Sequence, residues 1–363
     1  MKTIYYKPIL LILILLLSNY NVWAQEKVSK NIEKTYPLTN TGELHLDNKY
    51  GNIVINGWEE KTIQIVVNIE VSKKKKEDAT ELLKRIKSVI NSTEDFINIS
   101  SVIEEKSNSM FSRLFDKANP FDFDRGNIQI NYDIHLPHNA EINITNKFGD
   151  IIMNGWNGKL KVNQQHGDIW INKNLDNANI EMKFGKLKTK SITYGTIRFK
   201  NGEIDIEESK ELKITSSGTT ITIENVASLE IQSSKDKITI QQIGNIQGEL
   251  KFSSMNLNKV SEDINLTMEV TDFRVSKLQK PNANVIINQE SSELNINIAG
   301  TTLDFNASLE QGLLRIPKSF TNVKTDMIDK RKRIRNISAT YGTNRYSGKF
   351  QITGKKGIIV LTE

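Results

Sequence analysis

Two carboxylates and one ammonium group occupy equivalent places in a repeated pattern. Asp150, Asp168 and Lys186 each follow a glycine directly, and those glycines, Gly149, Gly167 and Gly185, are evenly spaced along the chain. If the units stack as strands, the two carboxylates lie about one strand spacing apart, ~4.8 Å. Paired carboxylates can cleave glycosidic bonds or contribute oxygens to a calcium site. Aspartate is also a favoured turn residue, and Lys186 would neutralise the column, so a structural role explains the same pattern.

Three tryptophans fall within the same kind of unit. Trp58 and Trp156 each follow an Asn-Gly pair, and Trp170 alternates with two isoleucines, which places it on the opposite strand face from them. An exposed indole stacks on a sugar ring while its N–H donates a hydrogen bond. Trp58, Trp156 and Trp170, with Asn56 and Asn154 as hydrogen-bonding neighbours, are therefore candidate ligand-binding residues. Burial of these indoles over the corners is the structural alternative.

A segment over residues 104–126 interrupts the pattern and is first polar, then aromatic. Phe111, Phe115, Phe121 and Phe123 are candidate residues for docking a partner, because an exposed apolar stripe marks an interaction surface. Packing of this excursion on its own domain is the alternative.

Charge and composition exclude several classes of function. The formal net charge is +6, carried by many charges of both signs, which does not indicate a nucleic-acid partner. The basic runs Lys73–Lys76 and Lys330–Arg335 are either solvated surface or sites for anionic groups. The chain has no cysteine, and only His135 and His138 of its four histidines lie close in sequence. We therefore expect no metal site and no cofactor, and no nucleotide-binding motif occurs.

The N-terminal region has the layout of a secretory signal peptide. Ile9–Leu17 is an apolar run too short to span a bilayer, and Val22 and Ala24 suit a cleavage site. We expect residues 1–24 to be removed and residues 25–363 to be exported, to the periplasm or the cell surface, without a transmembrane segment. Because there is no cysteine to carry a lipid, we do not expect a lipoprotein. An uncleaved N-terminal anchor is the alternative.

The elements that would position these residues are short strands in repeated units. The units NKYGNIVINGW (48–58) and NKFGDIIMNGW (146–156) differ by conservative changes, and looser copies follow them. Each has a turn residue and then an alternating strand rich in Val, Ile and Thr. A unit of this length cannot bury its apolar face alone, so stacking is required. The pattern predicts an all-β, parallel β-solenoid of about ten coils, resembling a single-stranded β-helix. An antiparallel sandwich is the rival.

One segment has helical spacing instead. Residues 76–91 predict an amphipathic helix that flanks the first coils and covers an open sheet edge. Its apolar residues recur at helical spacing, and they are Ala79, Leu82, Leu83, Ile86, Val89 and Ile90.

The chain resembles the bacterial putative-adhesin family, an envelope β-solenoid domain of unknown function. The residues that carry the resemblance are NKYGNIVINGW, EDATELLKRIKSVI, YDIHLPHNAEINITNKFGDI and the G-D-I units at Gly149 and Gly167. The resemblance covers most of the chain, best over residues 40–240, and it implies a solenoid outside the cytoplasm with no catalytic residues.

Together these observations predict a non-catalytic binding or scaffold protein of the cell envelope. Its ligand would be an envelope polysaccharide or an envelope protein. The alternative is a β-helical enzyme that cleaves polysaccharides with the stacked carboxylates Asp150 and Asp168.

Overall fold

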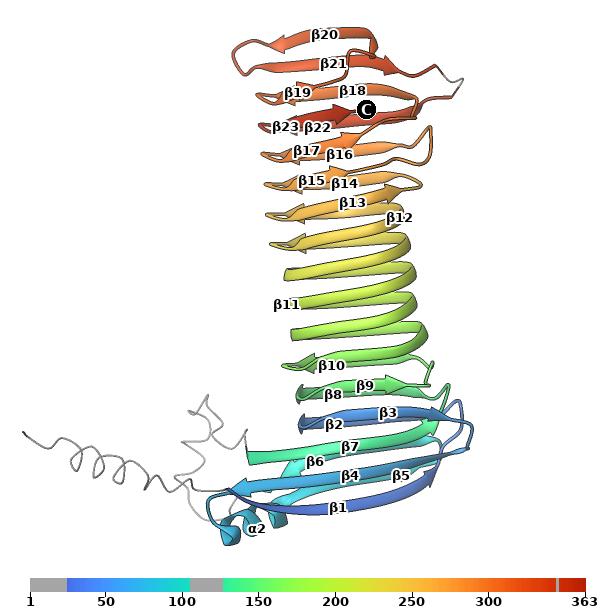
Figure 1. Ribbon diagram of the computed structural model, residues 1–363, viewed down its shortest axis with the longest axis vertical. Coiled ribbons are helices and arrows are strands. Elements are labelled where there is room, and N and C mark those ends of the chain that lie inside the picture. The colour runs from blue at the N-terminus through green and yellow to red at the C-terminus, as the bar shows by residue number, and fades with distance from the viewer. Residues whose placement is uncertain (1–24, 105–126, 344–345) are drawn as a thin grey trace, which may run out of the picture.

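The computed structural model describes residues 25–104, 127–343 and 346–363, which form an elongated rod (Figure 1). The described strands all belong to one continuous 23-stranded sheet with both parallel and antiparallel pairs, and one described helix, α2, packs at its N-terminal end. The predicted all-β class with one helix is therefore confirmed. Within the described ranges, no helix has the length and apolarity needed to cross a bilayer.

The elements follow one another along the chain with these bounds. They are β1 (Glu26–Pro37), β2 (Glu43–Tyr50), β3 (Ile53–Trp58), β4 (Thr62–Lys73), α2 (Lys76–Arg85), β5 (Ile86–Thr93), β6 (Phe96–Ile103), β7 (Ile128–Pro137), β8 (Glu141–Phe148), β9 (Ile151–Asn154), β10 (Leu160–Gln165), β11 (Ile169–Ser234), β12 (Lys237–Lys251), β13 (Ser254–Val260), β14 (Ile264–Glu269), β15 (Asp272–Val275), β16 (Val285–Glu290), β17 (Glu293–Asn297), β18 (Leu303–Glu310), β19 (Leu313–Arg315), β20 (Thr321–Asp329), β21 (Ile334–Tyr341), β22 (Gly348–Lys355) and β23 (Ile358–Thr362).

Most of the rod is a stack of parallel rungs, a rung being the stretch of chain after which the backbone returns to pair with itself. Leu160 pairs with Ala178, and Thr220 pairs with Lys237, in each case one rung further along the chain. The long strand β11 runs through several such rungs without a break (Figure 1). The separation of Leu160 from Ala178 equals that of Gly149 from Gly167, so the repeat read from the sequence is the spacing at which these strands pair.

Inward side chains of successive rungs stack in columns and form one core along the rod. Ile53 pairs with Ile151, and Ile151 pairs with Ile169; all three are 0 % exposed. The same alternation of buried and exposed residues runs through β2, β8 and β10 on the other face. A single rung would leave these side chains in water, so burial of apolar area between rungs drives the stacking.

The two most similar sequence units are adjacent in space. Asn48 pairs with Asn146 and Tyr50 with Phe148, so residues 48–58 lie directly on residues 146–156. Strands β1, β4, β5, β6 and β7 and the helix α2 form the N-terminal end of the rod (Figure 1). There β4 pairs antiparallel with both β1 and β7, and β5 pairs antiparallel with β6.

The helix is shorter than the sequence pattern predicts. It ends at Arg85, not at residue 91, and Ile86–Thr93 is strand β5. Residues 86, 89 and 90 are β-branched, and pairing with β6 outweighs their helical spacing. Ala79 and Leu82 are the buried helix residues, and α2 contacts β1, β4 and β5.

The C-terminal strands fill a layer that the chain first skips. After β17 the chain continues to β18 and β19, and only later do β22 and β23 enter below them. Strand β22 pairs with both β16 and β18, and β23 pairs with both β17 and β19. The last strands of the chain are consequently internal to the sheet and paired on both edges (Figure 1).

The prediction of an all-parallel sheet is wrong at both ends of the rod. The outermost strands β1 and β20 belong to antiparallel pairs, with β4 and β21 respectively. A parallel rung at the end of the stack would present unpaired N–H and C=O groups that invite further pairing, and natural sheets modify such edges. Antiparallel strands allow the chain to turn back and end the stack.

The repeated glycines are required by the close approach of successive rungs. A Cβ atom added at Gly167 would collide with the backbone carbonyl oxygen of Gly149, and one at Gly185 with that of Gly167. The atoms that would be hit belong to the backbone, which cannot move without breaking the hydrogen bonds between rungs. The even spacing of these glycines therefore reflects packing between rungs.

We expect Gly167→Ala to lower the free energy of unfolding by about 1–3 kcal/mol, because the added methyl group overpacks this contact. Gly312→Ala is the matched control, since its Cβ would meet its nearest atom at 3.6 Å and neither glycine has a positive φ. Urea unfolding of both variants measures the difference. Equal stability of the two variants would show that the corner is not tightly packed.

Candidate functional site

The tryptophans that follow Asn-Gly pairs are not equally available to a ligand. Trp156 is 0 % exposed, and its indole N–H donates to the carbonyl oxygen of Ala140 at 2.9 Å. The prediction that Trp156 stacks on a sugar is therefore wrong, because the ring packs inward over the corner. Trp58 is half-buried, and its N–H donates to the carbonyl oxygen of Thr62 at 2.8 Å.

Asn56 and Asn154 form part of an amide ladder on the outer side of β3 and β9. Asn154 donates to the side-chain oxygen of Asn56 at 3.3 Å, and Asn56 donates to Asp133 at 3.0 Å. Asn172 extends the ladder by donating to Asn154 at 2.7 Å. The two predicted asparagines are thus brought together, and each side chain already uses part of its hydrogen-bonding capacity within the protein.

Trp170 is the exposed member of the predicted set. Its side chain is 38 % exposed on the outer face of β11, beside Ile152 of the rung before it. Together with Asn56 and Asn154 it forms a surface that we call the Trp170 face.

The stacked carboxylates hold backbone groups of the next rung. Asp150 accepts the backbone N–H of Asp168 at 2.9 Å, and Asp168 accepts that of Lys186 at 2.8 Å. Asn52 accepts the N–H of Asp150 in the same way, at 2.8 Å. The Lys186 ammonium donates to Glu203 at 2.8 Å, and this hydrogen bond raises the pKa of Lys186. This geometry supports the structural alternative for the Asp column.

Phe111, Phe115, Phe121 and Phe123 lie outside the described residues. In the ranges that are described, no three His, Asp or Glu side chains form a group that could hold a metal ion.

Four rings from successive rungs form a stack that the sequence reasoning missed. The ring centroids of Tyr50 and Phe148 are 5.8 Å apart, those of Phe148 and His166 are 5.2 Å apart, and those of His166 and Phe184 are 4.8 Å apart. Each aromatic residue stands just before a turn glycine, which was the available signal. Phe184 is 46 % exposed, so one end of the ring stack faces solvent.

A shallow groove of about 870 Å³ runs over β2, β8, β10, β11 and β12. We call it the polar groove, and most of its lining residues have outward side chains on consecutive rungs, while Ile142, Leu160, Ala178 and Leu212 are buried. Its lining comprises Glu43, His45, Glu141, Ile142, Asn143, Lys159, Leu160, Lys161, Asn177, Ala178, Asn179, Tyr194, Gly195, Thr196, Glu211, Leu212, Lys213, Ser228, Glu230 and Gln247. The sequence reasoning missed this groove, because only the strand register aligns these polar positions.

The middle of the polar groove holds a lysine between two amides. Lys161 is exposed and pairs in the sheet with Asn143 on one side and Asn179 on the other. Tyr194, 40 % exposed, adds an aromatic ring, and its hydroxyl accepts a hydrogen bond from Lys210 at 2.9 Å. This part of the groove thus offers repeated hydrogen-bonding groups, the exposed ring of Tyr194 and the ammonium group of Lys161.

The other two lysines of the polar groove each form an ion pair with a glutamate of its lining. Lys159 lies 3.2 Å from Glu141, and Lys213 lies 2.6 Å from Glu230. Among the ion pairs within the described residues, none involves Lys161. Lys161 is therefore the cation in this groove best placed to meet an anionic group of a ligand.

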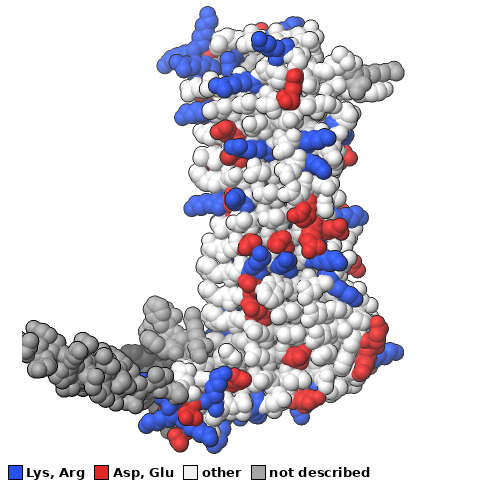
Figure 2. Space-filling model, viewed as in Figure 1, with Lys and Arg blue, Asp and Glu red and all other residues white. Residues whose placement is uncertain are grey.

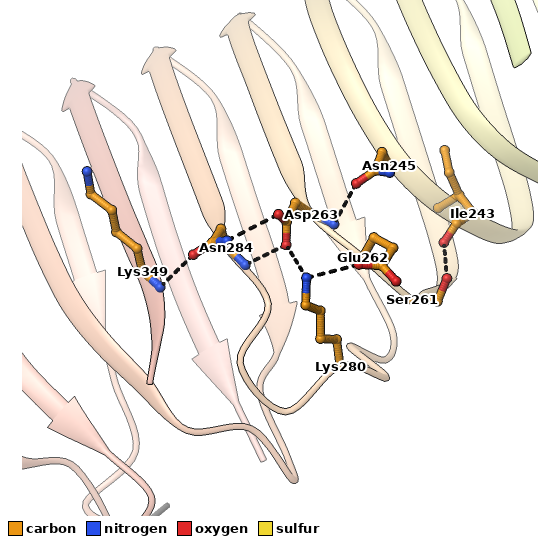
Figure 3. Close-up of polar contacts among 8 residues, drawn as sticks. All are labelled: Ile243, Asn245, Ser261, Glu262, Asp263, Lys280, Asn284 and Lys349. Atoms are coloured by element: carbon orange, nitrogen blue, oxygen red, sulfur yellow. Dashed lines mark hydrogen bonds and ion pairs between the residues drawn. The ribbon is translucent and has the colours of Figure 1, made fainter. Parts of the chain in front are cut away.

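A second ladder crosses a corner further along the rod (Figure 3). Asn245 accepts the backbone N–H of Asp263 at 3.2 Å, and Asp263 accepts that of Asn284 at 2.9 Å. Asn284 in turn accepts the N–H of Lys349, a residue of the C-terminal rung, at 3.0 Å. Lys280 donates to Asp263 at 3.2 Å. Burial alone would raise the pKa of Asp263, but the hydrogen bonds from Asn284 and Lys280 hold it below its ordinary value of 3.8.

Comparison with known proteins adds structures but no family assignment. No family model matches the chain, and no curated protein matches it. A putative cell adhesion protein from Clostridium sporogenes ATCC 15579 is 12 % identical, covering 92 % of this chain and 99 % of that one, with a TM-score of 0.22. A putative adhesin from Bacteroides fragilis NCTC 9343 is 9 % identical over 92 % and 97 % of the two chains, with a TM-score of 0.28.

A putative adhesin from Parabacteroides merdae ATCC 43184 is 12 % identical over 73 % of this chain and 96 % of that one, with a TM-score of 0.34. The descriptions of these three proteins agree with the family that the sequence resembles.

Asp263→Asn should reduce stability in a pH-dependent way. Because the folded-state pKa lies below 3.8, the carboxylate contributes stability that is present above about pH 5 and is lost as the pH falls through the folded-state pKa. Because the Asp263 carboxylate is partly exposed, the free energies of unfolding of wild type and variant should differ by less than about 1 kcal/mol. Urea unfolding of wild type and variant from about pH 2 to pH 6 measures it. Lys280→Met should make the stability less dependent on pH. If wild type and Asp263→Asn differ by the same amount at every pH, the carboxylate of Asp263 is not the titrating group.

Proposed function

We propose that the chain is a non-catalytic binding protein of the bacterial cell envelope. In this proposal residues 1–24 are a signal peptide, and residues 25–363 are an exported β-solenoid at the periplasm or the cell surface. The parallel pairing of each rung with the next supports the solenoid. The apolar run and cleavage pattern at the N-terminus support export.

We propose that the polar groove binds an extended envelope polysaccharide. The observation that carries this is the repetition of polar side chains on consecutive rungs, exemplified by Asn143, Lys161 and Asn179. Parallel rungs place such groups about 4.8 Å apart along a line. A linear polymer presents its hydroxyl groups in a similarly repeated way, and Tyr194 provides a face for one sugar ring.

The Trp170 face is a second proposed ligand surface, with Trp170 as the stacking residue and Asn56 and Asn154 as hydrogen-bonding residues. The exposure of Trp170 and the adjacency of the two asparagines support it. Cleavage of a polysaccharide by Asp150 and Asp168 has less support, since both carboxylates accept backbone N–H groups of neighbouring rungs.

Titration of the purified chain with fractionated envelope polysaccharides, followed by calorimetry, tests the groove. Lys161→Ala and Tyr194→Ala should each weaken binding of the recognised fraction at least about tenfold, because each removes a direct contact. Lys30→Ala, an exposed lysine of β1 outside the groove lining, is the matched control and should leave affinity unchanged.

Trp170→Ala distinguishes the two surfaces in the same titration. If it abolishes binding while Lys161→Ala and Tyr194→Ala have no effect, the groove proposal is wrong and the Trp170 face is the site. Absence of binding to any fraction would count against both surfaces and would favour an envelope protein as the ligand.

A further inference from the structure

The C-terminal end of the rod exposes apolar side chains on its last strand. Within the part of the chain that the structure describes, strand β20 pairs only with β21, and eight of its nine residues are exposed. Val323 is 51 % exposed, Met327 is 51 % exposed and Ile328 is 60 % exposed. These three are among the most exposed of the large hydrophobic residues that the structure describes, and all three lie on one hairpin.

Positive charge is concentrated in this hairpin and in the segment from Arg315 that leads into it. Residues 315–335 contain eight Lys and Arg residues and two Asp residues, a net charge of +6. The whole chain also has a formal net charge of +6, of which Lys2 and Lys7 of the proposed signal peptide supply +2, so the rest of residues 25–363 sums to −2. Figure 2 shows Lys and Arg side chains gathered at this end of the rod, with few carboxylates among them.

The turn between β20 and β21 holds its cations outward. Asp329 accepts the backbone N–H groups of Arg331 and Lys332, each at 2.9 Å, which shapes the turn. The side chains of Lys330 and Arg333 are also exposed. We call the exposed apolar residues of β20 together with Lys330–Arg333 the basic tip.

Strand addition does not suit the basic tip, although β20 has an unpaired edge. Its pairing with β21 is irregular between Thr321 and Lys324 and again between Met327 and Asp329. Bulges and charged residues such as Lys324 and Asp326 are the devices by which natural sheets block pairing at an edge. A partner of the basic tip must therefore bind to its side chains, which are both apolar and basic, and not to the backbone edge of β20.

We propose that the basic tip docks on an anionic lipid surface. Apolar side chains beside a cluster of Lys and Arg are the combination that binds at a membrane interface, where the apolar groups enter the headgroup region and the cations meet acidic lipids. The positive charge of the tip is complementary to such a surface, and the net negative charge of the rest of residues 25–363 is not. The inference is independent of the polysaccharide proposal, because the tip and the polar groove share no residues.

Sedimentation of residues 25–363, the exported protein of the proposed function, with vesicles tests this proposal. The chain should bind vesicles of equimolar phosphatidylglycerol and phosphatidylcholine, and bind pure phosphatidylcholine at least about 100-fold more weakly. The combined change Lys330→Ser, Arg331→Ser, Lys332→Ser and Arg333→Ser should weaken binding to the anionic vesicles about 100-fold or more. The double change Met327→Ser and Ile328→Ser should weaken it about tenfold.

The matched control is the other basic run. Lys74→Ser, Lys75→Ser and Lys76→Ser, at the N-terminal end of the rod, should leave vesicle binding unchanged. Circular dichroism of every variant should match that of the wild type, since all of the altered residues are exposed. Equal binding to both vesicle types, or no effect of the tip variants, would overturn the proposal. The proposal would also be overturned if the chain bound soluble dextran sulfate as tightly as vesicles and the double change at Met327 and Ile328 had no effect. That result would indicate a site for polyanions in general.

Discussion

The rod depends on the backbone hydrogen bonds between rungs, which hold successive turns of chain at one strand spacing. This spacing leaves no room for a side chain where two corners lie directly above one another, and Gly149 and Gly167 meet that requirement. It also requires successive rungs to have similar lengths, so that inward residues fall into columns such as Ile53, Ile151 and Ile169. Packing and backbone pairing therefore select the same register.

Columns of like residues explain why much of the polar repeat is structural. At two corners, an Asp or Asn side chain accepts the backbone N–H of the next rung, as Asp150 does for Asp168 and Asp263 does for Asn284. These oxygens satisfy backbone donors that the turn would otherwise leave without a partner. Corner side chains that already bind a backbone N–H are less available to a ligand. The outward strand positions of the polar groove are therefore the better candidates for ligand binding.

The ends of a stacked sheet need a different solution from its middle. At the N-terminal end, antiparallel strands and α2 follow the first rung, and the chain then returns to place residues 146–156 on residues 48–58. At the C-terminal end, β22 and β23 enter the skipped layer, and the β20–β21 hairpin is left outermost. A charged, irregular edge strand there blocks further stacking, and it leaves the basic tip free to meet a surface of opposite charge.

The sequence by itself determined the local properties of this protein: the alternation of apolar and polar residues, the glycine spacing, the presence of one helix and the all-β class. Each of these depends on neighbours within a few residues or on a short repeat. Only the tertiary structure decided that Trp156 is buried while Trp170 is exposed, that residues 86–91 join a strand, and that β22 lies between β16 and β18. Those outcomes depend on which distant segments pack together. Local sequence allows an indole to be buried or exposed, and it allows residues 86–91 to be helix or strand. Pairing with distant segments selects one state in each case.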